Sequence, residues 1–543
     1  MRAPPPPPPP PLATPTSADG AMAPSTSSED IGPPPPYHTP PPFVSCYSNP
    51  WYRRWVLFLL FLVTMMQSTD RNIPSILLPE IAPEFHMTDL GGGMLNGAAF
   101  VLIYAVATIP LARVADMYGR KILLVTSLLV WSTLTSLSAL ATSSRDLMIL
   151  RVGVGLGEAG CAPASVSLIA LMYGPYERAS AIAIQQLGFA AGIMAANFCA
   201  AVMVNSFGWR GILGVLGAPG YLLAAVIAIT LRDPPVVARA HRYVLDEETG
   251  ELRRRRRSKC ASIRDWWREL WEGVKECAAH LMKRPTFVHL TAGVMIQLGV
   301  GLAIMAFLPT FLERVHGMTT REVGFRIAIV GGVFGGFGVI LGGVVGDYLT
   351  TRSRGDQRHM LLFVLGCNVV AAPLNVFACL VDDANAATYS SAVVVALFMV
   401  MAGPPGAIVQ SLVPDRMRAT AQGFFGVLAN MIGGTMGPVI VGLLSDAFKK
   451  PYGDDGIRYA LALTMVFCLW GQFHWWMATR NLPKDVLVPG GGEGAEKGEA
   501  GSASGGAAGT EYVRLIDDER DGGGSNGGRG LYGSNSRERR AAS

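Results

Sequence analysis

WVLFLLFLVTMMQSTDRNIPSILL, at residues 55–78, is an almost uninterrupted apolar run that is long enough to cross a membrane as one helix. A helix rises about 1.5 Å per residue, so about 20 apolar residues cover the hydrocarbon core of a bilayer. Eleven further runs of this kind follow. The predicted spans are 54–78, 93–113, 121–141, 146–172, 180–204, 211–231, 286–312, 323–349, 359–381, 388–412, 419–446 and 457–479.

The composition agrees with a protein that lies in a membrane. Half of the 543 residues are hydrophobic and only 16% are charged, with a mean hydropathy of +0.33, whereas soluble proteins carry about a quarter charged residues. The apolar runs lack the alternation of barrel strands, and only a helix crosses hydrocarbon with its own backbone hydrogen bonds satisfied. We therefore predict an all-α, polytopic membrane protein with twelve transmembrane helices.

The chain divides into five expected segments. Residues 1–50 are proline-rich and residues 481–543 are rich in glycine and serine, and both compositions predict disordered tails. Residues 51–231 and 286–480 hold six predicted spans each, and a polar central loop at 232–285 joins them. Most lysines and arginines near the spans, including five arginines at residues 253–257, belong to the side of the two tails and this loop. The positive-inside rule therefore predicts that both termini are cytosolic. The net charge of +5 is explained by this topology, and we expect no nucleic-acid partner.

The two halves of the chain resemble each other. ARVADMYGRK at residues 112–121 follows the second span and GVVGDYLTTR at 343–352 follows the eighth, which places Asp116 and Asp347 231 positions apart. PYERASAIAI before the fifth span is echoed by PDRMRATAQGF before the eleventh, so Arg178 and Arg418 correspond. Two pseudo-symmetric six-helix bundles predict a substrate site near the midplane between them and transport by alternating access.

Ionisable residues inside the spans are few, and they are the first functional candidates because a charge in hydrocarbon costs several kcal/mol. Asp70 and Arg71 lie in the first span, and Arg151 and Glu158 lie in the fourth. The two spans run in opposite directions, so helix rise places Asp70 and Arg151 at similar depth, with Glu158 about two turns deeper. A carboxylate buried near an arginine can exchange a proton, because burial opposes its charge and the cation favours it. We predict that these four residues form a proton-linked charged switch, and the alternative is a permanently paired structural network.

The turn after the second span is a second candidate site. It resembles the signature of the major facilitator superfamily, G-x-x-x-D-R/K-x-G-R/K-R/K, although Ala112 replaces the first glycine and Met117 replaces a basic residue. The carboxylate can cap or pair with the ends of neighbouring helices, and the basic residues can hold the turn at the headgroups. We expect a cytosolic gate that stabilises one conformation, and the alternative is a simple basic turn. Its candidate residues are Asp116, Gly119, Arg120, Lys121, Asp347, Arg178 and Arg418.

Further motifs resemble the spinster-like branch of this superfamily. They are DRNIP from residue 70, RVGVGLGEAG from residue 151, RDPP from residue 232 and RATAQGFFGVLANMIGGTMGPVIVGLLSD from residue 418. The resemblance implies the major facilitator fold and a proton-linked or facilitative exporter, with lysolipid or sphingolipid-like amphiphiles as substrates. It also implies that Asp70, Arg71, Arg151 and Glu158 are the charged switch residues of the branch. The alternatives are a carrier of an organic anion or a sugar, and a transport-inactive membrane sensor or scaffold.

Seven polar residues within the spans are candidate substrate contacts, although an interhelical hydrogen bond explains each of them equally simply. They are Asn96, Tyr104, Gln185, Gln186, Asn197, Gln297 and Asn430. The eight cysteines form no CxxC pair, and the chain contains neither G-x-x-x-x-G-K-[ST] nor H-E-x-x-H. We therefore expect no ATP-driven pump, no enzyme, no metal site and no cofactor.

Two weaker patterns concern partners of the chain, which we expect to be a monomer. PPPPY from Pro33 to Tyr37 contains PPxY, which resembles a ligand of WW domains, although low complexity also explains it. The arginines at 253–257, with Trp266, Trp267 and Trp271, fit a segment that lies on the lipids of the inner leaflet. The membrane in which the protein resides is left open by the sequence.

Overall fold

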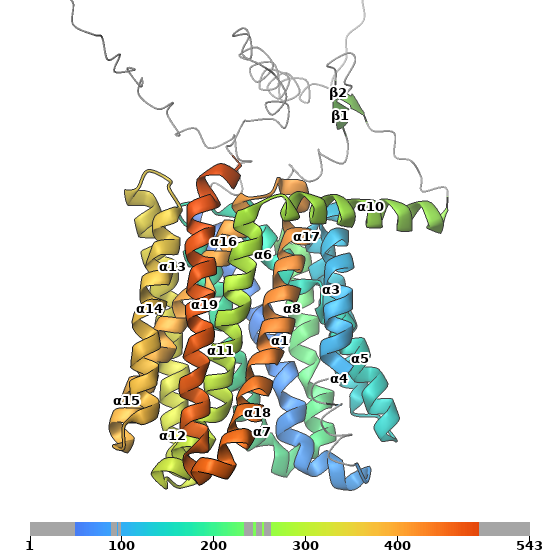
Figure 1. Ribbon diagram of the computed structural model, residues 1–543. Coiled ribbons are helices and arrows are strands. Elements are labelled where there is room, and N and C mark those ends of the chain that lie inside the picture. The colour runs from blue at the N-terminus through green and yellow to red at the C-terminus, as the bar shows by residue number, and fades with distance from the viewer. Residues whose placement is uncertain are drawn as a thin grey trace, which may run out of the picture.

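The computed structural model of the chain describes residues 49–87, 95, 99–232, 243–245, 252–254 and 262–487. These residues are almost entirely helical, and the long helices run side by side in one bundle (Figure 1). Nearly all of the two predicted tails, the PPPPY sequence from Pro33 to Tyr37, the arginines at 255–257 and the cleft candidate Asn96 lie outside the described residues.

The described residues of the first half form six spans from seven helices, because α7 is divided between the fifth span and the sixth. The helices are α1 (Pro50–Glu84), α3 (Ala99–Tyr118), α4 (Arg120–Ser138), α5 (Ser144–Glu158), α6 (Cys161–Met172), α7 (Arg178–Leu216) and α8 (Ala218–Thr230). Within α7 the backbone of Gly208 has φ 59° and ψ 178°, so the chain turns there. This turn separates the predicted fifth span from the sixth, and glycine adopts such a positive φ without the strain of a side chain.

The second half repeats this arrangement after α10 (Ile263–Met282), which lies across one end of the bundle (Figure 1). Its spans are α11 (Pro285–His316), then α12 (Thr320–Ile327), η2 (Ala328–Phe334) and α13 (Gly335–Arg352), then α14 (Arg358–Leu380), then α15 (Ala384–Met399), η3 (Val400–Ala402) and α16 (Pro404–Ser411). After η4 (Asp415–Met417), the last two spans are α17 (Arg418–Gly426), η5 (Val427–Gly433) and α18 (Gly434–Tyr452), followed by η6 (Gly453–Asp455) and α19 (Gly456–Asp485). In the central segment, β1 (Tyr243–Leu245) pairs antiparallel with β2 (Leu252–Arg254), a detail that the all-α prediction did not contain.

The structure has a helix at each of the twelve predicted spans. Ten helical stretches of the described residues are long and apolar enough to cross a membrane. The last of them, Asp415–Asp485, turns back at Gly453 and so contains two spans. The 35-residue helix α1 supplies the remaining one. The all-α polytopic fold is therefore confirmed.

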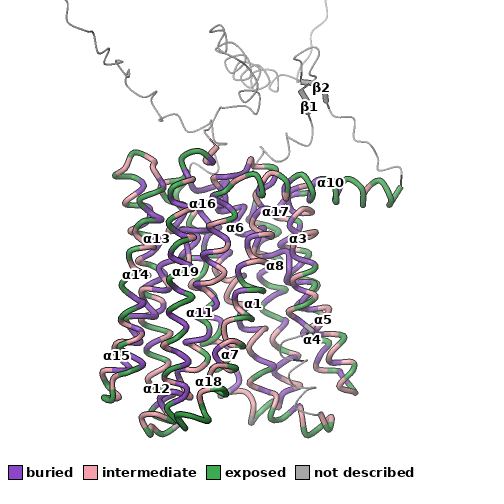
Figure 2. The backbone as a smooth tube through the Cα atoms, in the orientation of Figure 1, coloured by how far each residue is buried: buried purple, intermediate pink, exposed green. Residues whose placement is uncertain are grey.

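Among the described residues, the hydrophobic core is continuous between the halves at one end of the bundle and divided towards the other. We call the end where α10 lies the α10 end and the other the opposite end. At the α10 end, buried side chains of both halves, such as Leu168 and Ile408, belong to one cluster. Towards the opposite end, each half has a cluster of its own, with Trp209 in the first and Ile457 in the second. Buried residues recur along the helices of the bundle, whereas the part of α10 that extends beyond the bundle is mostly exposed (Figure 2).

Glycines let several helices of the second half approach each other closely. A Cβ on Gly437 of α18 would overlap the carbonyl oxygen of Gly299 on α11, and a Cβ on Gly342 of α13 would overlap that of Val400. Small residues are the usual means of close helix packing in membranes, because lipid offers no hydrophobic driving force between helices. These contacts hold the second half together as a bundle.

Candidate functional site

The four charged residues of the first and fourth spans lie together and form two ion pairs. In the first pair, Arg151 Nη1 on α5 donates to Asp70 Oδ2 on α1 at 2.8 Å, and Arg151 Nη2 donates to the Asp70 backbone oxygen at 2.7 Å. Thr135 Oγ1 on α4 donates to the other carboxylate oxygen, Oδ1, at 2.7 Å. Asp70 and Arg151 are both buried. Each oxygen of the Asp70 carboxylate therefore has a donor, and the pair joins three helices.

The second pair is held differently. Arg71 Nε donates to Glu158 Oε2 at 2.7 Å, and the Glu158 side chain is fully buried whereas that of Arg71 is 27% exposed. Glu158 Oε1 is buried without a hydrogen-bond partner among the described residues. A buried ionised oxygen without a donor is unfavourable, so this carboxylate is much less well satisfied than that of Asp70.

The local sequence explains why the pairs separate. Asp70 and Arg71 are consecutive on a helix, so their side chains leave it about 100° apart, and one is buried while the other reaches an exposed surface. Arg151 and Glu158 are seven residues apart, which places both on the same face of α5. The two carboxylates therefore meet the two arginines at two levels of the same interface between α1 and α5.

Two aromatic rings of α3 cover the arginines. The Arg71 guanidinium carbon lies 4.4 Å from the centroid of the Tyr104 ring and 5.2 Å from that of Phe100. The Arg151 guanidinium carbon lies 5.5 Å from the Phe100 centroid. Rings at these distances stabilise a cation through their π faces. Tyr104, a predicted cleft residue, thus contacts the switch itself, whereas Phe100 had no polar signal in the sequence.

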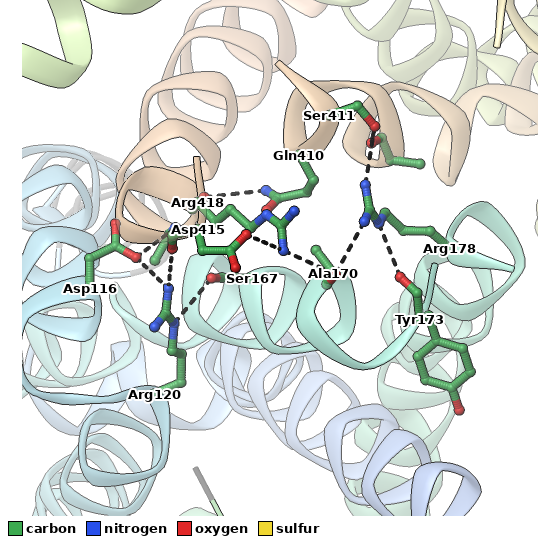
Figure 3. A network of polar contacts seen from close by, with 12 residues as sticks. Asp116, Arg120, Ser167, Ala170, Tyr173, Arg178, Gln410, Ser411, Asp415 and Arg418 are labelled. Atoms are coloured by element: carbon green, nitrogen blue, oxygen red, sulfur yellow. Dashed lines mark hydrogen bonds and ion pairs between the residues drawn. The ribbon is translucent and has the colours of Figure 1, made fainter. Parts of the chain in front are cut away.

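The gate candidates form a polar network at the α10 end (Figure 3). Asp116, at the end of α3, accepts hydrogen bonds from the backbone nitrogens of Ala419 at 3.1 Å and Thr420 at 2.8 Å, and from Thr420 Oγ1 at 2.7 Å. The carboxylate thereby caps the first turn of α17, where free N–H groups and the helix dipole favour an anion. Arg120 Nη2 donates to Asp116 Oδ1 at 2.7 Å and to the Asp415 backbone oxygen at 2.9 Å.

Asp347, in the duplicated turn, makes the corresponding contact in the other direction. At the end of α13, it accepts hydrogen bonds from the backbone nitrogens of Ala179 at 3.1 Å and Ser180 at 2.7 Å, and so caps the first turn of α7. The residue four positions later is Thr351, which donates to the Asp347 backbone oxygen at 2.8 Å and leaves the carboxylate without an arginine like Arg120. The two caps are related by the internal repeat but are unequal.

Two arginines that the repeat relates meet between these caps (Figure 3). Arg178 Nη2 and Arg418 Nη1 both donate to the Ala170 backbone oxygen at the end of α6, each at 3.2 Å. Arg178 Nη1 also donates to Ser411 Oγ at 3.1 Å, and Arg418 Nη1 lies 2.9 Å from Asp415 Oδ1. These contacts add further bonds between the halves. We call the two caps and the two arginines together the latch.

Two further gate candidates shape the turn itself. Gly119 precedes α4 with φ 107°, a conformation that favours glycine, and Lys121 lies half-buried in the first turn of that helix.

Within the described ranges, every hydrogen bond that we identify between residues 49–232 and 262–487 lies at the α10 end. The bundle is therefore closed at this end.

The remaining cleft candidates take different positions. Gln185 is buried and its Nε2 donates to Thr64 Oγ1 at 3.1 Å, between α7 and α1, whereas Gln186 is exposed. Asn197 and Asn430 are exposed, and each donates to a carbonyl oxygen of its own helix, four residues earlier. These two asparagines therefore have free surface, but their amides are engaged locally.

Gln297 lies inside the second half. It is fully buried, donates to Asn368 Oδ1 at 3.0 Å and accepts from Gln472 Nε2 at 3.3 Å, so it joins α11, α14 and α19. This is the interhelical hydrogen bonding that the sequence offered as the alternative.

Thr135 and Thr420, which donate hydrogen bonds to Asp70 and Asp116, were not among the predicted site residues, because a hydroxyl in an apolar run has no distinctive spacing.

Comparison with known proteins gives consistent results. A family model described as Major Facilitator Superfamily matches residues 60–438. The chain is 29% identical over 432 residues to an MFS-type efflux pump of Mycolicibacterium smegmatis. The aligned region covers 79% of this chain and 93% of that protein. It is 26% identical over 408 residues to a probable galactarate/D-glucarate transporter of Bacillus subtilis, with coverages of 73% and 86%. Its structure is similar to that of a bacterial homologue of the human lysosomal transporter Spinster, in an inward-facing and unoccupied conformation. That similarity has a TM-score of 0.53 and 25% identity, and covers 81% of this chain and all of the other.

Proposed function

The chain belongs to the major facilitator superfamily of membrane transporters, and we propose that it is a proton-linked secondary transporter whose proton is bound by the Arg71–Glu158 pair. It is a multi-pass integral membrane protein and a transporter rather than an enzyme. The observation that carries the proposal is the Glu158 carboxylate, which is fully buried, has Arg71 on one oxygen and has no hydrogen-bond partner for the other within the part of the chain that the structure describes.

Protonation of Glu158 changes what holds Arg71. A neutral carboxylic acid no longer attracts the guanidinium as an ion, while burial favours the neutral form. Arg71 is partly exposed and lies over Tyr104, so it is free to turn towards an anionic group of a substrate once Glu158 is neutral. Loss of the proton restores the ion pair. In this way, proton binding and substrate binding use the same arginine.

The Asp70–Arg151 pair has a different role in this proposal. Both oxygens of Asp70 have donors and both residues are buried, so removal of either charge is costly. We assign this pair to holding α1 against α4 and α5 through the cycle. In this proposal, the predicted switch of four charged residues divides into a permanent pair and an exchanging pair.

The latch supplies the second part of the mechanism, which is alternating access. The halves are joined by hydrogen bonds at the α10 end and have separate cores towards the opposite end. The positive-inside rule assigns the α10 end to the cytosol, since Arg120, Arg178 and Arg352 lie there. With that orientation the structure is the outward-facing state, and rocking of the halves breaks the latch to give the inward-facing state.

For the substrate, we propose an amphiphile with an anionic head, such as a lysolipid or a sphingolipid-like molecule. Support comes from the resemblance of the sequence motifs to the spinster-like branch, which implies such substrates, and from the small number of ionisable residues within the predicted spans, which suits an apolar tail. A carrier of small organic anions is the second candidate, and the similarity to the probable galactarate/D-glucarate transporter favours it. Both substrates would use the positive charge of Arg71.

The test begins with lipid and metabolite profiling of cells with and without the protein, which identifies the transported compound. Flux of that compound is then measured in proteoliposomes with an imposed pH gradient. The wild type should respond to the gradient, Glu158→Gln should not, and Asp454→Asn should behave as the wild type because Asp454 is exposed at the opposite end. An unchanged response of Glu158→Gln would refute the assignment of the proton site.

A further inference from the structure

We propose that the outer part of α10 binds the membrane surface at the α10 end, with exposed tryptophans at the lipid interface and a row of cations on anionic phospholipid headgroups. This surface is separate from the transport site. It concerns residues 263–275, which form the first two thirds of the helix.

The position of α10 brings this surface to the level of the headgroups. The helix lies across the ends of the spans, roughly perpendicular to them, and its N-terminal part extends beyond α3 and α17 (Figure 1). A helix in this position is parallel to the membrane plane and reaches past the rim of the bundle. What lies beside the bundle at this level is the surface of the bilayer.

One apolar stripe runs along the whole helix. Its members follow the spacing i, i+4, i+7, i+11, i+14 and i+18, which keeps them on one face. They are Ile263, Trp267, Leu270, Val274, Cys277 and Leu281. The last four are buried against the bundle, whereas Ile263 is 78% and Trp267 is 48% exposed. The outer members therefore face the same way as the buried ones, towards the membrane, but the described residues leave them largely exposed.

The charges of α10 are sorted on either side of this stripe. At about 100° per residue, Arg264, Arg268 and Lys275 fall on the flank that carries Trp271, which is 45% exposed. The acidic residues fall on the far flank, away from Trp267 and Trp271: Asp265, Glu269, Glu272 and Glu276. Arg268 reaches across to Glu272 at 2.8 Å. A cationic row beside interfacial tryptophans matches a leaflet that contains anionic lipids, because the negative surface potential of such a leaflet attracts lysine and arginine side chains.

Contacts of α10 with both halves fix this orientation and link the helix to the latch. Trp266 Nε1 donates to Tyr118 Oη at the end of α3, at 2.8 Å. Glu276 Oε1 lies 2.9 Å from Arg416 Nη2, in the turn that carries the latch residues of the second half. The helix therefore touches both halves beside the latch. When the outer face of α10 binds lipid, the membrane surface therefore holds in place a helix that contacts both halves of the bundle.

The test uses the full-length protein in vesicles and does not depend on transport. Tryptophan emission is quenched with brominated phosphatidylcholine and, separately, with aqueous iodide, in vesicles with and without phosphatidylglycerol. Trp267→Phe combined with Trp271→Phe should lower the fraction of emission that brominated lipid quenches. Trp209→Phe is the matched control, because Trp209 is buried at the opposite end. In the wild type, phosphatidylglycerol should increase the quenching of Trp267 and Trp271 by brominated lipid. The double variant should not show this increase, because it lacks both tryptophans.

The cation row is tested in the same assay by Arg264→Gln combined with Lys275→Gln, which leaves the tryptophans in place. We expect this variant to lose the effect of phosphatidylglycerol. Two results overturn the proposal. One is emission from Trp267 and Trp271 that iodide quenches and brominated lipid does not, as it would if the face pointed into water or served a protein partner. The other is quenching by brominated lipid that is indifferent to phosphatidylglycerol, which would exclude recognition of anionic headgroups.

Discussion

Asp116→Asn should open the bundle at the α10 end, because this side chain makes the most hydrogen bonds across the joint between the halves. Its two oxygens accept from Arg120, from the backbone nitrogens of Ala419 and Thr420, and from Thr420 Oγ1, all between 2.7 and 3.1 Å. An asparagine keeps the shape but has only one oxygen. Its NH₂ group must face at least one backbone N–H of α17, and two donors cannot bond.

The size of the effect follows from these contacts. A buried donor left without its acceptor costs about 1–3 kcal/mol, and Arg120 also loses its charged partner, so the closed state should lose about 3 kcal/mol. At 1.4 kcal/mol per factor of ten, the equilibrium shifts about 100-fold towards the open state. Asp347→Asn also leaves one backbone N–H without its acceptor, but no arginine like Arg120 loses its partner, so the closed state should lose only about 1 kcal/mol, or about fivefold.

Distances between spin labels report the opening directly. Ile122 at the start of α4 and Leu362 at the start of α14 are exposed, lie near the α10 end and belong to different halves. The labels are placed at these positions and the native cysteines are replaced. Asp116→Asn should then show a population with a long distance between the labels, and this population should be much smaller in Asp347→Asn. Asp454→Asn, at the opposite end, is the control. Equal opening in Asp116→Asn and Asp347→Asn, or none in either, would refute the account of the latch.

Three further predictions concern stability and reactivity. Arg151→Ala should lower the free energy of unfolding by about 3–5 kcal/mol, because it leaves Asp70 buried without its cation, and adding Asp70→Ala should recover part of the loss in a thermal unfolding assay. Gly437→Ala should lower the unfolding temperature, because its Cβ overlaps the chain of α11, whereas Gly332→Ala should not, since the described residues leave room there. Burial raises the pKa of the Cys277 thiol to about 12. With Cys277 as the one remaining cysteine, alkylation by iodoacetamide should therefore keep accelerating up to about pH 10, whereas a thiol of ordinary pKa near 8.5 levels off.

The fold and the Asp70–Arg151 pair could be predicted because they follow from spacing, whereas the partner of Glu158 could not. The length of each apolar run gives the spans, and helix rise with alternating direction gives depth. That argument placed Asp70 and Arg151 at one level, and the structure has them in contact. The cap formed by Asp116 was predicted only in kind. Its partners are backbone N–H groups, which every residue except proline has, so no side-chain pattern identifies α17 as the helix that it caps.

The cleft was less accessible to sequence reasoning. The position of a polar residue in an apolar run gives its depth in the membrane, but it does not say whether the side chain points into the cleft or towards another helix. Gln297 illustrates the difficulty, because it donates a hydrogen bond to another helix of the second half. The exposure of α10 had the same limit. The apolar stripe of α10 can be recognised from its spacing in the sequence. The sequence does not show how much of the stripe is covered by the bundle, because this depends on where α3 and α17 end.

Proton movement driven by substrate tests the central claim most directly. Proteoliposomes that contain a pH-sensitive dye and either wild-type protein or Glu158→Gln would receive the compound identified by profiling, with no pH gradient imposed. The account predicts a change of internal pH with the wild type and none with Glu158→Gln, which should still exchange the compound across the membrane. Equal proton movement by both proteins would contradict the assignment of the buried Glu158 carboxylate as the proton site.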